Sequence, residues 1–126
     1  MILGIGIDSV QINRIRKALD RHGSRFAEKI LTEQELRVFE FHSSPERYLA
    51  KRYAVKEAFS KAFGTGIRVP VTWKNIETHH DKLGAPKIIL SGPLDQMFRE
   101  RGLLHVHVSV TDETDLATAF VILEGS

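Results

Sequence analysis

Residues 45–66 predict one long helix and a glycine-containing loop, and the rest of the fold must be arranged around them. Pro45 suits the first helical position, with Ser44 before it as a candidate N-cap. Gly64 stands where a left-handed C-cap is expected, so the helix should run from about Pro45 to Phe63. Small residues at every fourth position let a neighbouring element approach this helix closely. They are Ala50, Ala54 and Ala58.

Glu57 is the only acidic residue between Arg47 and Arg68. Four basic residues surround it in the sequence: Lys51, Arg52, Lys56 and Lys61. One interpretation is an i, i+4 ion pair with Lys61 on a solvated helix face, which stabilises a helix by about 0.2–0.5 kcal/mol. The other is that Glu57 binds a ligand.

Residues 3–8 alternate apolar residues with two glycines and an acid, which predicts a strand with one apolar face. Gly4 and Gly6 on the other face indicate close approach of a backbone or a ligand. This glycine lane ends at Asp8. Its carboxylate either caps the following helix or binds a ligand, and the sequence alone favours neither.

A basic helix is expected from Gln11 to His22, with Arg14 and Arg21 on its exposed face. The net charge of +2 hides an asymmetry, because residues 1–68 contain 13 Lys/Arg and 8 Asp/Glu. A docking surface for an acidic partner is therefore favoured over a merely solvated face.

The remainder of the chain predicts short helices and antiparallel strands. A capping box at residues 32–35 should begin a helix, and this role accounts for Glu35. Strands are expected at 72–80, 87–91, 104–111 and 116–123, with a helix between residues 92 and 102. The predicted fold is α+β: a single compact domain over residues 1–126, with a mainly antiparallel sheet packed against the long central helix.

Composition excludes several classes of protein. The chain has no cysteine, so it can form neither disulfides nor thiolate metal sites. No apolar run approaches membrane-spanning length, and the N-terminal residues lack the basic start of a signal peptide. A cytoplasmic protein without membrane contact is the default expectation. His105 and His107 share a strand face, but a metal there would need a third ligand.

Asp8 and Glu57 can together supply the oxygen ligands that Mg²⁺ prefers. Lys61 lies one turn after Glu57 and could reach a phosphate oxygen. Gly64 and Gly66 could let the backbone approach the same ligand. A metal, a lysine and a glycine loop together suit chemistry on a phosphate or pyrophosphate.

These residues lie in motifs that resemble the holo-[acyl-carrier-protein] synthases, the short-chain 4′-phosphopantetheinyl transferases. The resemblance covers essentially the whole chain. The similar segments are residues 4–8 with Arg14-Ile15, residues 26–32, residues 51–66, Gly84-Ala85-Pro86 and His107-Val108-Ser109. The segment 51–66 is the most specific of them.

The resemblance implies an activity: the 4′-phosphopantetheine arm of coenzyme A, the donor substrate, is transferred to a serine of apo acyl carrier protein, with adenosine 3′,5′-bisphosphate released. It also implies Mg²⁺ bound by Asp8 and Glu57, with Lys61 on the pyrophosphate. Because Ser9 and Gln11 stand where the family often has aliphatic and acidic residues, no third carboxylate ligand is expected.

The resemblance further implies a homotrimer, with coenzyme A bound between subunits near Gly64, Gly66 and His107. Arg14 and Arg21 would dock the acidic carrier protein. The catalytic base stays open among Glu57, a metal-bound hydroxide and another acid.

Two other functions would use some of the same residues. A nucleic-acid-binding domain is disfavoured, because the charge is not strongly one-sided and aromatic residues do not alternate with the basic ones. A Mg²⁺-dependent phosphoesterase would use the same residues. Its product, free phosphopantetheine, would distinguish it from a transferase.

Overall fold

The computed structural model describes residues 1–126 and contains five α-helices, one 3₁₀ helix and five strands. In chain order they are β1 (Ile2–Gln11), α1 (Ile12–His22), α2 (Ser24–Ile30), α3 (Glu33–Phe41), α4 (Pro45–Phe63), η1 (Trp73–Asn75), β2 (Ile76–His80), β3 (Pro86–Leu90), α5 (Gly92–Glu100), β4 (Leu103–Asp112) and β5 (Leu116–Gly125). The expected elements all occur, but the strand predicted from residue 72 begins later, because the 3₁₀ turn precedes it. None of the helices is long and apolar enough to span a bilayer.

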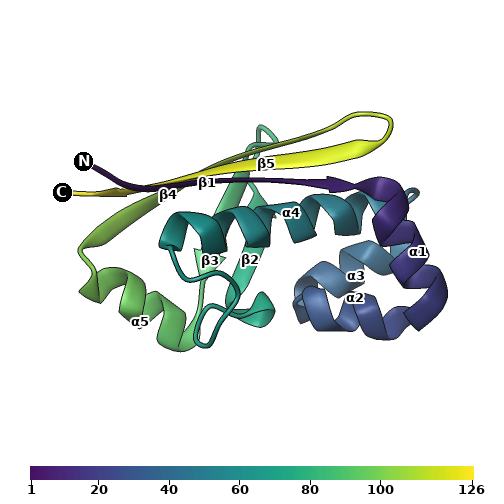
Figure 1. Ribbon diagram of the computed structural model, residues 1–126, viewed down its shortest axis with the longest axis horizontal. Helices are drawn as coiled ribbons and strands as arrows, with labels where there is room; N and C mark the ends of the chain where they lie inside the picture. Colours follow the sequence, from purple (N-terminus) through teal and green to yellow (C-terminus); the bar gives the residue numbers. More distant parts are fainter.

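Helix α4 lies between the main sheet and the other helices (Figure 1). The sheet has the order β1-β5-β4, with both neighbouring pairs antiparallel. Strands β2 and β3 form a separate antiparallel hairpin. The predicted α+β fold, an antiparallel sheet on a long central helix, is confirmed, with the strands divided between two sheets.

The ends of α4 follow local sequence signals. Gly64 is left-handed with φ 91°, and its N–H donates to the carbonyl oxygens of Ser60 and Lys61. Ser44 occupies the N-cap position, but its side chain makes no hydrogen bond to the helix backbone. Pro45 then begins the helix, as expected from its fixed φ and missing N–H.

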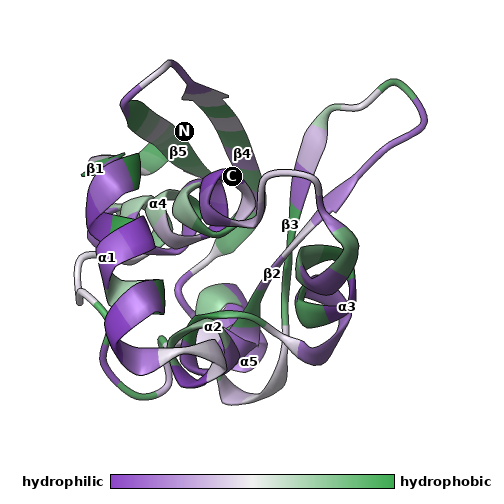
Figure 2. Ribbon diagram, turned by 90° about the vertical axis from the view of Figure 1, so that its right-hand side faces the viewer, coloured by the Kyte–Doolittle hydropathy of each residue, from purple (hydrophilic) through white to green (hydrophobic).

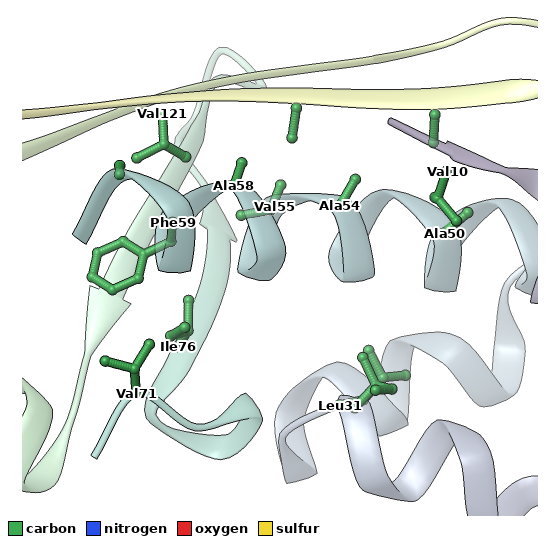
Figure 3. Close-up of a cluster of buried hydrophobic side chains, with 14 of the residues drawn as sticks. Val10, Leu31, Ala50, Ala54, Val55, Ala58, Phe59, Val71, Ile76 and Val121 are labelled. Carbon is green, nitrogen blue, oxygen red and sulfur yellow. The ribbon is translucent and has the colours of Figure 1, made fainter. Parts of the chain in front are cut away.

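The glycines of β1 face α4. A Cβ atom built on Gly6 would lie 2.1 Å from the carbonyl oxygen of Ala58, and one built on Gly4 would lie 2.1 Å from that of Ala62. Ala54 and Ala58 point from α4 toward the sheet (Figure 3). Only glycine on the strand and small residues on the helix permit this backbone-to-backbone approach.

Two of the alternating apolar residues of β1, Ile5 and Ile7, lie on the outer face of the sheet. They are 61% and 58% exposed, and Phe120 on the neighbouring β5 is 39% exposed. Leu3 instead lies beside Ala62 and Leu123, because the register of β1 shifts between Ile2 and Gly4. A contiguous apolar face of this kind is typical of an interaction surface.

Candidate active site

Asp8 lies on the inner face of β1, with Gly4 and Gly6, and projects toward α4. Its Oδ1 accepts a hydrogen bond from Lys61 Nζ at 2.9 Å, and the same Nζ donates to the carbonyl oxygen of Ile7 at 3.1 Å. The helix-cap interpretation of Asp8 is wrong, because β1 continues to Gln11 and Asp8 lies within it.

Glu57 lies on α4, one turn before Lys61. Lys61 forms its ion pair with Asp8, so the i, i+4 pair that would explain Glu57 as a solvated surface residue does not form. Burial raises the pKa of Glu57, and the negative charge of Asp8 raises it further. Lys61 and Arg14 act in the opposite direction. Two carboxylates therefore share one small region and repel each other.

This donor set fits Mg²⁺. The carboxylates of Asp8 and Glu57 are the oxygen donors that would be on offer there, and the chain has no cluster of three or more histidine, aspartate or glutamate side chains suited to a metal. Mg²⁺ is commonly held by one or two carboxylates while water and substrate phosphates complete its shell. The repulsion between the two carboxylates is the kind of strain that a bound cation relieves.

The glycine loop after α4 has an open backbone. Gly64 and Gly66 have φ of 91° and 68°, and a Cβ atom on either would meet nothing within 4 Å. The N–H of Gly66 donates to the carbonyl oxygen of Ser60 at 3.2 Å. Gly64 and Gly66 follow Lys61 by three and five residues in the chain. A ligand bound at Lys61 can therefore approach this backbone.

His107 is not brought to this group within one chain. It lies on β4, and the strand pairings place it beside Ile122, which in turn pairs with Ile5. His107 is therefore on the outer face of the sheet, two strands from β1, which is about 10 Å. Its Nε2 bonds to Glu124 Oε1 at 2.8 Å.

The exposed side of α1 is strongly polar (Figure 2). Arg14 and Arg21 both line an open groove of about 640 Å³ along α1, together with Lys17 and Asp20. A second groove of about 650 Å³ continues from Arg21 toward Arg25 on α2. The positive charge of Arg14 also acts to lower the pKa of Glu57, against the larger effect of burial.

Two of the basic residues that surround Glu57 in the sequence are buried. Lys56 is fully enclosed and Arg52 is 5% exposed. Lys56 Nζ forms an ion pair with Glu35 Oε1 at 2.7 Å. The capping box that Glu35 completes is confirmed. That the same carboxylate also binds a buried lysine was not predicted from the sequence.

Comparison with known proteins gives the family of the chain. The profile of the 4′-phosphopantetheinyl transferase superfamily matches residues 4–121. The chain belongs to this superfamily. Holo-[acyl-carrier-protein] synthases from Polaromonas sp. and Vibrio parahaemolyticus are 48% and 49% identical to it. The alignments cover 98% of this chain and 97% and 98% of those two relatives.

Solved structures of the superfamily have the same fold. The Neisseria meningitidis holo-[acyl-carrier-protein] synthase has a TM-score of 0.96 and 45% identity, covering 98% of this chain and 99% of that one. The Bacillus anthracis synthase, a complex with coenzyme A (3′,5′-ADP), has a TM-score of 0.84 and 41% identity, covering 100% and 99%. These two structures align with nearly the whole chain, so they share the arrangement of helices and strands described above.

Proposed function

We propose that the chain is a holo-[acyl-carrier-protein] synthase that transfers 4′-phosphopantetheine from coenzyme A to a serine of apo acyl carrier protein. Adenosine 3′,5′-bisphosphate is the second product. The observation that carries this proposal is the meeting of Asp8 on β1 with Glu57 and Lys61 on α4. This group combines oxygen ligands for a cation with a positive charge for a phosphate.

Asp8 and Glu57 are the proposed Mg²⁺ ligands. Bound Mg²⁺ would neutralise negative charge on the pyrophosphate oxygens. Lys61, which is half exposed, would leave Asp8 and donate its N–H groups to a phosphate oxygen of the donor. A cation at Asp8 would repel the ammonium group, so loading the site would itself favour this exchange of partners.

Gly64 and Gly66 are proposed to contact coenzyme A through their backbone. Their open surroundings and positive φ support this role. Together with Lys61 they occupy the last turn of α4 and the loop after it. A long, charged donor such as coenzyme A could extend from the carboxylate pair along these residues.

A homotrimer is proposed, with the outer face of the sheet as its contact surface. The exposed Ile5, Ile7 and Phe120 support this assignment. His107 lies on that same face, away from the site of its own chain. Association through this face would let His107 serve a site on a neighbouring subunit, where it would contact coenzyme A.

The acidic carrier protein is proposed to dock on α1 through Arg14 and Arg21. These residues line the groove along α1, and the charge of Arg14 also acts on Glu57, so a docked carrier could present its serine to the site. A single transferase domain over residues 1–126, working in the cytoplasm for fatty acid biosynthesis, completes the proposal.

The test is intact-mass analysis of apo acyl carrier protein incubated with the chain, coenzyme A and Mg²⁺. The carrier should gain the mass of one phosphopantetheine, and adenosine 3′,5′-bisphosphate should appear in equal amount. A carrier of unchanged mass, with free phosphopantetheine released, would instead indicate a phosphoesterase.

A further inference from the structure

Lys56 and Glu35 form an ion pair that is closed to solvent. Lys56 is 0% and Glu35 is 2% exposed. Besides Glu35 Oε1 at 2.7 Å, Lys56 Nζ donates to the carbonyl oxygens of Ile30 at 2.7 Å and Trp73 at 2.9 Å. Each N–H of the ammonium group therefore has its own acceptor, and the three acceptors come from the end of α2, from α3 and from η1.

The Glu35 carboxylate extends the same network. Its Oε1 accepts the Thr32 N–H at 3.0 Å, at the start of α3, and its Oε2 accepts the Thr78 N–H of β2 at 3.0 Å. Arg52 Nε lies 4.0 Å from Oε2. The pair is saturated with protein partners and has no free position for a ligand. Its function must lie in what it connects.

Packing alone does not explain the pair. Removing two charges from water costs several kcal/mol per ion before their attraction is counted, and apolar residues of similar volume often replace such pairs without loss of stability. Buried charges do, however, provide direction, because their hydrogen bonds fix both partners in one orientation. Apolar contacts leave a helix freer to turn about its axis.

The pair lies next to the candidate active site in the chain. Lys56 directly precedes Glu57 on α4, and its acceptors belong to elements on the side of α4 away from the main sheet (Figure 1). On the sheet side, the backbone of Ala58 contacts β1 at Gly6. One side of α4 is thus held by close backbone contact. On the other side, apolar residues such as Phe59 pack in the core, and the Lys56 hydrogen bonds add directional contacts to α2, α3 and η1 (Figure 3).

We propose that Lys56 is a positioning residue whose ion pair with Glu35 fixes the rotation of α4 and so holds the Glu57 carboxylate beside Asp8. This inference rests on the metal site proposed above. A side-chain tip lies about 6 Å from a helix axis, so a rotation of about 10° moves it by about 1 Å. Displacements of about 1 Å in an active site can lower rates by about 100-fold.

The test variant is Lys56→Met/Glu35→Gln, which removes both charges at nearly constant volume. Lys56→Met alone would leave Glu35 buried without a counter-charge and would destabilise the fold for that reason. Val55→Ala is the matched control, because Val55 is fully buried on the same helix but makes no directional bond. All proteins are compared at a temperature where each is folded.

Two quantities are measured: kcat and KM for transfer, and Mn²⁺ affinity from the EPR signal of free Mn²⁺ with coenzyme A present. The double variant should bind Mn²⁺ about tenfold more weakly and lose about 10- to 100-fold in kcat, with KM for coenzyme A within threefold. Val55→Ala should lower the unfolding midpoint but keep kcat and Mn²⁺ affinity within twofold. Glu57→Gln should lose Mn²⁺ binding.

A folded double variant with the Mn²⁺ affinity and kcat of the unmodified protein would overturn the proposal. Equal losses in Val55→Ala would overturn it as well, because they would follow from reduced stability alone. A double variant without a cooperative unfolding transition would assign the pair to folding, not to positioning. If Glu57→Gln binds Mn²⁺ normally, the metal site itself is wrong and the positioning role fails with it, while transfer by the unmodified protein would still support the function.

Discussion

Gly6→Ala tests whether close contact between β1 and α4 sets the geometry of the site. The added Cβ would lie 2.1 Å from the Ala58 carbonyl oxygen and 2.6 Å from the Ala62 nitrogen. Ordinary C···O contacts are about 3.3 Å or longer, so strand and helix must separate by about 1.2 Å. Both obstructing atoms are backbone atoms, so no side-chain rotation can relieve the clash.

The expected cost has two parts. Overpacking of this kind destabilises a protein by about 1–3 kcal/mol, while replacing glycine with alanine recovers about 0.4–1 kcal/mol from the unfolded chain. The unfolding midpoint should therefore fall by several degrees. Asp8 lies on the strand side of the contact and Glu57 on the helix side. A separation of about 1 Å should accordingly lower turnover by about 100-fold.

The assay combines thermal unfolding with the initial rate of phosphopantetheine transfer at saturating substrates. Ser9→Ala is the control, because Ser9 lies on the same strand but faces outward, bonded to Thr118 Oγ1. It should keep the midpoint within about 2 °C, since one exposed hydrogen bond contributes little. Gly6→Ala with an unchanged midpoint and normal turnover would refute the close-contact reasoning.

Four further predictions concern pH dependence, the stability of the metal-free protein, carrier docking and assembly. Because the pKa of Glu57 is raised, turnover should fall at a higher pH on acidification than it would for an exposed glutamate. A higher Mg²⁺ concentration should move this loss of turnover to lower pH. A loss of turnover that occurs at the same pH at every Mg²⁺ concentration would contradict the ligand role. The protonated Glu57 stabilises the folded protein relative to the ionised form. This contribution is fully present below the pKa that Glu57 has in the unfolded chain, and it is lost as the pH rises through its higher pKa in the folded protein. In metal-free protein at pH 7, Glu57→Gln should therefore raise the unfolding midpoint, measured by thermal denaturation. Arg21→Glu should raise KM for the carrier protein about tenfold and leave KM for coenzyme A unchanged, with a smaller effect at high salt. A carrier KM that changes neither with the substitution nor with the salt concentration would contradict docking on α1. Ile5→Lys should produce a monomer in sedimentation with little transfer activity, and a fully active monomer would defeat the homotrimer.

Local signals in the sequence predicted the elements well. The bounds of α4 follow from Pro45 and Gly64, and the capping box at Thr32 sets the start of α3. These features depend on residues within a few positions of one another. Their outcome is decided by backbone conformation and capping bonds, which the sequence contains.

Long-range partners could not be predicted in the same way. In the sequence Lys56 resembles a surface lysine. Its hydrogen-bond acceptors are Glu35 and the carbonyl oxygens of Ile30 and Trp73, which lie far from it in the chain and cannot be identified from the residues around it. The alternation in β1 likewise identified two faces but not which one is buried. The apolar face of a strand is usually the buried one. Here the small residues of α4 let its backbone pack on the glycine face of β1 instead, which leaves Ile5 exposed.

The proposed mechanism depends on a metal held by Asp8 and Glu57. The transfer rate of Asp8→Asn as a function of Mg²⁺ concentration measures this dependence, with thermal unfolding as the control. Asparagine keeps the size of the side chain but removes the charge. The Asp8→Asn protein should fold, with a transfer rate lower by about 100-fold or more and a Mg²⁺ requirement shifted upward. A folded Asp8→Asn protein with a near-normal rate and Mg²⁺ dependence would contradict this mechanism.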